Sequence, residues 1–524
     1  MKGRVVSKYL GLFIAAIALL MLPSALWAVY FKEWGALASF LEAIAAAAGL
    51  GAVFSVIGWR AGRTIYQREA LGLVGIGWLM AAGIGALPYV MHGALSPVDA
   101  FFESMSGFTT TGSTVLTDIE SWPRSMLFWR SFTHWLGGMG IIVLFIAVLP
   151  FLGAGGKQLF KSESPGPDPR GLRPRIKDTA SILWKIYFGL TIAQTLLLMI
   201  CGMSFYEALC HTFGTLATGG FSTRQASIAA FDSLSIELVI IVFMVVAGTN
   251  FGLYFAMLRG RWLAPFKNTE WRIYVLLLVL GTGLITLNLL SVQGGAPVVP
   301  PGTPAHWAEV DAAEAGETSN DAAQKADAGA PGQFPGYTPG KALRMGAFQV
   351  VSIMTTTGYC TDDFNRWPYF SRMLLVILMF VGGCAGSTGG GMKVVRIILL
   401  LKLVYRRLEG TFRPKTIRAI RISNTVVDAP IQNTVYAFFV LHVFVFAAGI
   451  VVMSGLGLPF ETAFTSVAAT LNNIGPGLQL VGAVQDYHLI PGAGKLLLAL
   501  FMAMGRLELF SICVLFLPAF WRHA

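Results

Sequence analysis

Glycine and threonine recur at a fixed spacing in four short segments of this 524-residue chain. Aligned on one glycine each, the segments end in Thr-Thr-Thr-Gly, Ala-Thr-Gly-Gly, Thr-Thr-Thr-Gly and Asn-Asn-Ile-Gly. Glycine permits a positive φ that turns successive carbonyl oxygens toward one axis, and threonine adds a hydroxyl oxygen. A ring of such oxygens replaces the hydration shell of a monovalent cation. We therefore predict a cation filter with ligands from Thr110, Thr111, Gly112, Thr218, Gly219, Gly220, Thr356, Thr357, Gly358, Asn473, Ile474 and Gly475.

The residues that precede each glycine predict a short helix leading into the filter. Small residues stand twelve positions before the glycines, at Ala100, Ala208, Gly346 and Ala463, and again six positions before them. Such spacing falls near one face of a helix, whose negative C-terminal end would then favour a cation. A single copy fits a small-residue packing motif as well as it fits a filter. Four copies in register favour the filter.

A second group of residues predicts a gate beneath this filter. The glycine-rich stretch Gly382–Gly391 interrupts an apolar segment, and an unbroken helix is unlikely there because each glycine costs about 1 kcal/mol relative to alanine. We interpret it as a gate loop that blocks the pore, with a simple hinge or a packing site as the alternative. The residues assigned to the gate are Gly386, Gly389, Gly390, Gly391, Lys393 and Arg506.

Arg506 lies in the middle of the last apolar segment, where a charged side chain costs at least about 2.5 kcal/mol. It should therefore face a cavity or a partner, and the candidates are carbonyls near Gly389–Gly391 or the carboxylate of Glu508. A pore-facing arginine would slow cations, whereas the alternative is a buried salt bridge. Lys393 marks the expected cytoplasmic exit, although an ordinary snorkelling lysine fits equally well.

The composition of the chain predicts that these sites lie in a membrane. The chain is 55% hydrophobic and only 12% charged, unlike a soluble protein. Its net charge is +11, and the basic residues lie between apolar runs. This placement indicates membrane orientation and contact with lipid rather than nucleic acid. Ten segments are long enough to cross, about 9–30, 36–58, 71–91, 125–150, 181–202, 234–258, 272–292, 371–401, 431–453 and 494–517.

The basic clusters fix the expected orientation. Every Lys/Arg-rich connection falls on one side if all ten segments cross, so both termini should be cytoplasmic. Four of the outside connections contain a further apolar stretch too short to cross, at about 98–115, 205–222, 343–360 and 460–477. The predicted fold is an all-α membrane protein of ten transmembrane helices with four re-entrant pore loops.

The repeat divides the chain into five parts. Residues 1–69 supply two additional N-terminal helices, and residues 70–155, 156–262, 263–422 and 423–524 each supply one helix–loop–helix repeat. The third repeat contains the gate loop, 382–391, and an external insert, 293–340, that is acidic and of low complexity. Such composition is typical of disorder. A cation-attracting role for the insert is the alternative to a tolerated insertion.

Other classes of protein fit less well. The string Gly386–Lys393 lacks the G-x-x-x-x-G-K-[ST] pattern of a phosphate-binding loop, and we find no nucleophile–base set, so the chain is not expected to be an enzyme or to hold an organic cofactor. A coupled transporter for an organic solute should have inverted repeats, whereas these share one orientation. A non-transporting sensor or scaffold remains to be tested.

Several of these motifs together resemble the Trk/Ktr/HKT superfamily of potassium transport proteins, and most closely its Trk-type membrane subunits. The residues that carry the resemblance are Ala100–Ser104, Thr109–Gly112, Gly219–Thr223, Gly382–Lys393, Ala468–Gly477 and Gly505–Glu508. The similarity runs over nearly the whole chain. Two features depart from the family pattern: Tyr359–Asp362 after the third filter, and the acidic insert.

The resemblance implies a fold and a function. The fold would be four M1-P-M2 repeats around one pore plus the two N-terminal helices, in a homodimer in the bacterial plasma (inner) membrane. The ion would be K⁺, with Rb⁺ or Na⁺ also permeant, and Arg506 would contact the gate loop. A cytoplasmic ring of TrkA-type nucleotide-binding subunits would regulate gating. The alternative function is an H⁺- or Na⁺-coupled symporter of the same family, or a less selective monovalent cation channel.

Overall fold

The chain folds almost entirely into helices. The computed structural model describes residues 3–61, 67–148, 176–292, 337–414, 419–423 and 425–521, so most of the predicted insert, 293–340, lies outside the described residues. One two-residue antiparallel pair joins β1 (Arg421–Ile422) to β2 (Thr425–Val426). Short 3₁₀ turns occupy Ser227–Phe231, Phe364–Arg366, Gln479–Val481 and Val514–Phe516.

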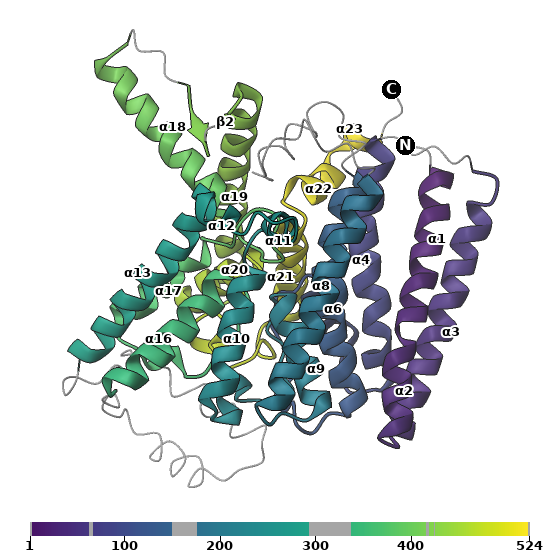
Figure 1. The fold of residues 1–524 in the computed structure, drawn as a ribbon. Coiled ribbons are helices and arrows are strands. Elements are labelled where there is room, and N and C mark those ends of the chain that lie inside the picture. The colour runs from purple at the N-terminus through teal and green to yellow at the C-terminus, as the bar shows by residue number, and fades with distance from the viewer. Residues whose placement is uncertain are drawn as a thin grey trace.

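The helices follow the order of the predicted apolar segments (Figure 1). They are α1 (Gly3–Leu20), α2 (Leu22–Tyr30), α3 (Trp34–Ile57), α4 (Gln67–Met91), α5 (Pro97–Phe108), α6 (Arg124–Val148), α8 (Ile176–Ile200), α9 (Phe205–Leu216), α10 (Leu234–Ala247), α11 (Phe251–Leu258), α12 (Ala264–Lys267), α13 (Thr269–Ser291), α16 (Pro339–Met354), α17 (Tyr369–Met379), α18 (Val394–Phe412), α19 (Ala429–Gly455), α20 (Phe460–Leu471), α21 (Gly492–Arg506), α22 (Phe510–Cys513) and α23 (Pro518–Trp521).

The length and composition of these helices are those of a membrane protein. Within the described residues six helices are long and apolar enough to cross a bilayer, or up to eight if each of two bent pairs forms one crossing. The bent pairs are α10 with α11, at 93°, and α21 with α22 and the following turn, at 120°. The predicted segments 234–258 and 494–517 are therefore not single straight helices. In the first, the Asn250 side chain accepts the Gly252 N–H at 2.7 Å and starts a new helix.

Four short helices stand apart from the long ones: α5, α9, α16 and α20. Three begin at a hydroxyl N-cap, since Ser96, Ser204 and Thr338 each accept the backbone N–H three residues further on. At 12 or 16 residues they are too short to cross a bilayer. They lie in the four stretches that the sequence singles out between the long apolar segments.

The short helices pack in a cycle. Each contacts the helix before it (α4, α8, α13, α19) and the helix after it (α6, α10, α17, α21). Each also contacts a helix of the neighbouring repeat: α5 meets α21, α9 meets α6, α16 meets α10 and α20 meets α17. This third set of contacts closes the four repeats on one another. The pair α1 and α3 lies beside α4, outside the cycle (Figure 1).

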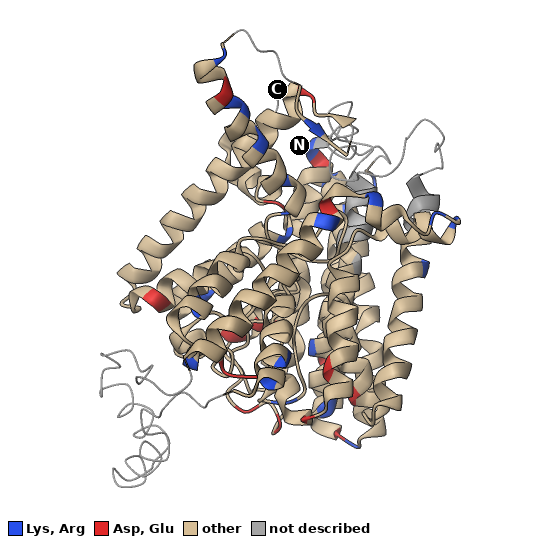
Figure 2. Cartoon of the chain, turned by 60° about the vertical axis from the view of Figure 1, so that its left-hand side comes forward, with Lys and Arg blue, Asp and Glu red and all other residues tan. Residues whose placement is uncertain are grey.

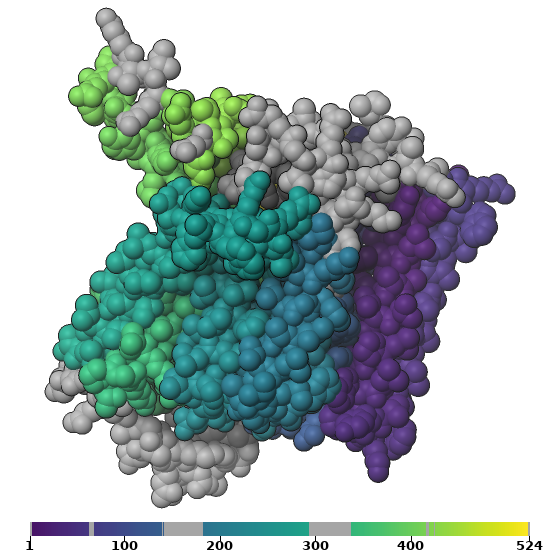
Figure 3. Space-filling view, viewed as in Figure 1, coloured from purple at the N-terminus to yellow at the C-terminus, as the bar shows by residue number. Residues whose placement is uncertain are grey.

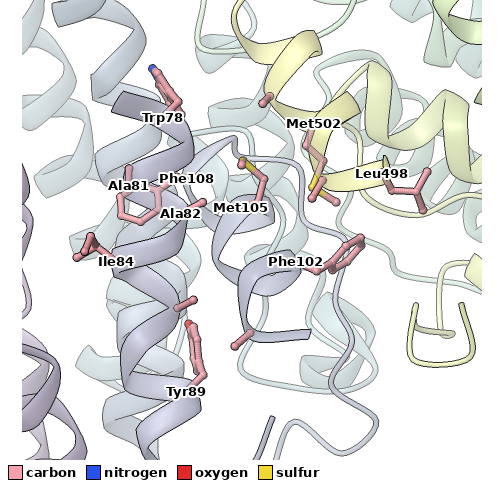
Figure 4. Packing of buried hydrophobic residues seen from close by; sticks show 14 of the residues in the cluster. Trp78, Ala81, Ala82, Ile84, Tyr89, Phe102, Met105, Phe108, Leu498 and Met502 are labelled. Carbon is pink, nitrogen blue, oxygen red and sulfur yellow. The ribbon is translucent and has the colours of Figure 1, made fainter. Parts of the chain in front are cut away.

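Buried apolar side chains hold α5 in place. Phe102 and Met105 of α5 are fully buried. Met105 lies between Ala82 of α4 and Met502 of α21, and Phe102 lies below Met502 and Leu498 of α21 (Figure 4). Because close-packed interiors resist small displacements, this packing fixes the residues that follow α5. The end of each short helix is thus positioned by the core rather than by a free loop.

Both termini lie at one end of the molecule, from which α18 projects beyond the body (Figures 1 and 3). Lysine and arginine recur along this helix, as Figure 2 shows. Its exposed residues also include large apolar ones, among them Leu401, Leu408 and Phe412.

Candidate cation-binding ring and gate loop

The four short helices end in the same backbone conformation. The residue two before each aligned glycine has a positive φ, of 53° to 60°, at Thr110, Thr218, Thr356 and Asn473. The N–H of each of these residues bonds to the carbonyl three residues earlier, and the next N–H bonds to the carbonyl five residues earlier. This is the Schellman arrangement, which normally takes glycine or asparagine at its left-handed position. Three copies place β-branched threonine there, which costs about 1–3 kcal/mol each.

The aligned glycines lie against one another in a closed ring, here called the glycine ring. Each has a φ of 80° to 102°. A Cβ on Gly112 would overlap the carbonyl oxygen of Gly219, and one on Gly475 would lie 2.8 Å from that of Thr111. The same relation joins Gly220 to Thr357 and Gly358 to Ile474. Every glycine therefore touches the carbonyl just before the next glycine, and only a residue without a side chain fits.

The side chains at the four left-handed positions have different partners. The Thr218 hydroxyl donates to the carbonyl of Ala217 at 2.5 Å, and that of Thr356 accepts the N–H of Gly390 at 2.7 Å. The Thr110 hydroxyl has no hydrogen-bond partner within the described part of the chain. The amide of Asn473 donates to the Thr111 hydroxyl at 2.9 Å and to the Met502 carbonyl at 2.8 Å. The ring is thus regular in its backbone and irregular in its side chains.

A cavity opens on one side of the glycine ring and is lined by all four glycines. Arg130 also lines it and pairs with the buried carboxylate of Glu103 at 2.6 Å. The same carboxylate accepts the N–H of Val115 at 2.9 Å, and Arg130 donates to the carbonyl of Ser222 at 2.9 Å. This pair therefore links the first loop to the second. The Glu103 carboxylate also neutralises the positive charge of Arg130, which would otherwise repel a cation in the cavity.

Hydroxyl groups support the loops that surround this cavity. Tyr487 and Ser113 both donate to the carbonyl of Gly475, at 2.8 and 3.0 Å. Tyr359 donates to the carbonyls of His211 and Phe221, at 3.1 and 3.2 Å. The unusual residues after the third aligned glycine thus begin with a side chain that supports the second loop.

The predicted gate loop lies on the other side of the glycine ring. It separates α17 from α18, which confirms the predicted interruption of this segment. Gly390 donates to Thr356, and a Cβ on Gly390 would lie 2.7 Å from the carbonyl oxygen of Asn472. The Thr388 hydroxyl donates to the carbonyl of Leu216 at 2.9 Å. The loop therefore contacts the ends of three of the four short helices.

A buried carboxylate holds the base of the gate loop, and the sequence alone gave no reason to select it. One oxygen of Glu270, in the first turn of α13, accepts the N–H of Ala385 at 2.7 Å and that of Val395 at 3.1 Å. Only 1% of Glu270 is exposed. The break between α10 and α11 adds further bonds, since Cys384 donates to Gly248 at 2.8 Å and Phe251 donates to Gly386 at 3.0 Å.

Arg506 contacts the gate loop at a carbonyl next to Gly389, which confirms one of its two expected partners, whereas the other, Glu508, is not its partner. Its guanidinium donates to the carbonyl of Thr388 at 2.7 Å and to that of Gly137 in α6 at 3.0 Å. Glu508 instead accepts from Arg396 at 2.7 Å, because the chain turns sharply after α21. The ammonium group of Lys393 donates to the carbonyl of Gly389. The structure thus brings together Arg506, Lys393 and the gate-loop glycines.

Three further residues around the ring, Glu103, Arg130 and His134, are not among the predicted site residues. Glu103 belongs to the Ala100–Ser104 motif, but its spacing gives no hint of Arg130. His134 of α6 bonds through one ring nitrogen to the carbonyl of Gly107 at 2.8 Å and through the other to the N–H of Phe221 at 3.2 Å. A charged or imidazole group within an apolar segment is the signal that would have selected all three.

Known proteins resemble this chain in both sequence and structure. A family described as "TrkH: Cation transport protein" matches residues 52–523. The chain is 38% identical to the Trk system potassium uptake protein TrkH of Halomonas elongata and 36% identical to that of Escherichia coli K12, over 100% of each chain. Its structure superimposes on the crystal structure of the potassium transporter TrkH from Vibrio parahaemolyticus with a TM-score of 0.83, 33% identity and full coverage of both chains.

Proposed function

This chain belongs to the TrkH family of cation transport proteins, and from that premise we propose that it takes up K⁺ through the glycine ring. The observation that carries the proposal is the closed cycle of Gly112, Gly220, Gly358 and Gly475 at the ends of four short helices. Four negative helix ends converge there, which favours a cation over an anion. The names of the relatives supply the identity of the ion.

The proposed ligands are backbone and hydroxyl oxygens of the twelve predicted filter residues. Each loop contributes the left-handed residue, the residue after it and the aligned glycine, for example Thr110, Thr111 and Gly112. Carbonyl and hydroxyl oxygens suit a monovalent cation because they replace water without adding charge. Asn473 replaces threonine in the fourth loop, which makes the inner end of the pore asymmetric. We expect Rb⁺ to pass as K⁺ does and Na⁺ to pass less well.

Flow would be limited by the gate loop and Arg506. Two hydrogen bonds hold the guanidinium against Thr388 and Gly137, and the side chain is 2% exposed. A positive charge at this depth repels cations because the surroundings screen it weakly. Lys393 would mark the cytoplasmic exit. Opening then requires the loop to release its contacts with Glu270, Thr356 and Arg506.

The architecture would comprise ten crossings and four re-entrant loops. In this scheme α10 with α11, α17 with α18, and α21 with α22 are three broken crossings. Residues 1–69 form the two N-terminal helices, and 70–155, 156–262, 263–422 and 423–524 form the repeats. Both termini face the cytoplasm of a bacterial inner membrane. A homodimer that binds a cytoplasmic TrkA-type nucleotide-binding ring would be the working assembly.

Radioactive Rb⁺ influx into liposomes tests the proposal. The purified chain should support influx that K⁺ inhibits, and its regulator should increase the rate. Absence of influx both with and without the regulator would refute the proposal. Repeating the assay over a series of Na⁺ concentrations and pH values separates a pore from the symport alternative, because only coupled transport requires the second ion.

A further inference from the structure

One filter residue touches the gate loop differently from its three counterparts. The Thr356 hydroxyl accepts the backbone N–H of Gly390 at 2.7 Å, and both groups are fully enclosed in protein. Within the described residues, no hydrogen bond joins Thr110, Thr218 or Asn473 to residues 382–391. The four positions share one backbone conformation, so this bond is a property of the third repeat alone.

Gly390 is buried between the third and the fourth filter loop. Asn472 and Asn473 lie on its other side, where a Cβ on Gly390 would approach Asn473 Cβ to 2.8 Å. Leaving a buried N–H without an acceptor costs the full desolvation free energy of that group. The Thr356 hydroxyl therefore stabilises the position of the loop directly beneath the ring, and this position differs from the base of the loop, which Glu270 holds.

Backbone strain gives this bond a second consequence. Thr356 is β-branched and has a φ of 60°, a conformation that persists only where the surroundings impose it. The carbonyl of the next residue, Thr357, lies against Gly220 in the ring. The bond to Gly390 thus joins the gate loop to the part of the third loop that contacts the second.

We propose that Thr356 is a positioning residue that latches the gate loop to the filter, so that closure of the loop and the conformation of the third filter loop are coupled. The inference rests on the proposed function, because the loop can act as a gate only if the glycine ring is a K⁺ pore. Coupling of this kind is reciprocal: a cation that stabilises the filter conformation also stabilises the closed loop. The partner of the latch is a backbone N–H, so any side chain with an acceptor of the right length at position 356 preserves it.

Amide hydrogen exchange of residues 382–393 in the full-length protein tests the latch without requiring transport. In Thr356→Val the Gly390 N–H loses its acceptor, and exchange in this segment should become about tenfold faster. Thr356→Ser keeps the hydroxyl and should match the wild type. Thr218→Val is the matched control, because it removes an equivalent hydroxyl that donates to the carbonyl of the preceding residue, Ala217, and not to the gate loop. It should leave the segment unchanged.

Equal exchange in wild type, Thr356→Val and Thr218→Val would overturn the proposal. If Thr356→Val does not fold, amide exchange of residues 382–393 in Thr356→Ala tests the proposal instead. A second readout is the ratio of Rb⁺ influx without the regulator to influx with it, which should rise in Thr356→Val. If the wild type carries no Rb⁺, the proposed function fails, while the exchange measurement still decides whether the latch exists.

Discussion

Glu270→Gln tests whether the base of the gate loop is held by charge. In the wild type one carboxylate oxygen accepts two backbone N–H groups, from Ala385 and Val395. A hydrogen bond to a charged group contributes about 1.5–3 kcal/mol and a neutral one about 1 kcal/mol. The amide oxygen of glutamine keeps the geometry but not the charge, so each bond should lose about 0.5–2 kcal/mol and the closed loop about 1–4 kcal/mol. That loss changes the ratio of open to closed loop by a factor of at least about 5.

The assay is Rb⁺ influx into liposomes in the absence of the regulator, where the closed loop limits the rate if the proposed gate is correct. Glu270→Gln should raise this basal influx by a similar factor and leave the K⁺/Na⁺ ratio unchanged, since the filter is untouched. Glu237→Gln is the control, because Glu237 is equally buried but pairs with Arg344 at 2.6 Å, away from the loop. Basal influx that stays at the wild-type level in folded Glu270→Gln protein would show that the carboxylate does not hold the gate.

Three further variants test the rest of the site. Arg506→Ala should raise Rb⁺ influx because the charge beneath the ring is lost, and equal or lower influx in folded protein would remove its role as a barrier. Gly220→Ser should lower the K⁺/Na⁺ ratio measured by ion competition, whereas Gly189→Ser, where a Cβ meets open space, should not; equal ratios would exclude this loop from the pore. Glu103→Ala should destabilise the protein by about 3–5 kcal/mol in thermal unfolding because it leaves a buried cation unpaired. Glu207→Ala, whose partner is 44% exposed, should cost at most about 1 kcal/mol, and a similar loss in both would contradict the distinction.

The repeating parts of the molecule could be predicted because they are set by local chemistry. Small residues at fixed spacing before a glycine predict a short helix, and the structure has one in all four places. The left-handed residue two before each glycine is not predicted by that spacing. The replacement of threonine by Asn473 does not break the pattern, since asparagine suits the left-handed conformation better than threonine does. The interruption at Gly382–Gly391 is predictable for the same reason, because glycine disfavours helix whatever surrounds it.

The remaining parts depend on contacts between segments far apart in the chain. Glu270 and Ala385 are 115 residues apart, and Glu103 and Arg130 come from different helices. The break after Ala247 contains a single glycine, Gly248, and is sharp because the gate loop bonds to the carbonyl exposed there. No spacing rule links such partners. A polar residue that would be costly in an apolar segment is the only local sign that a partner exists.

The contrast between regular backbone and irregular side chains suggests how one pore can be both selective and gated. Selectivity needs equivalent oxygens around an axis, and the four Schellman ends supply them with one geometry. A single gate loop approaches the ring from one repeat, so it cannot contact all four repeats alike. The third repeat breaks the equivalence below the ring, where Thr356 bonds to the loop that follows it in sequence. Arg506 then acts on that loop from the fourth repeat, through the Thr388 carbonyl. Changes to the third and fourth repeats should therefore alter gating more than equivalent changes to the first and second, although all four contribute alike to the ring.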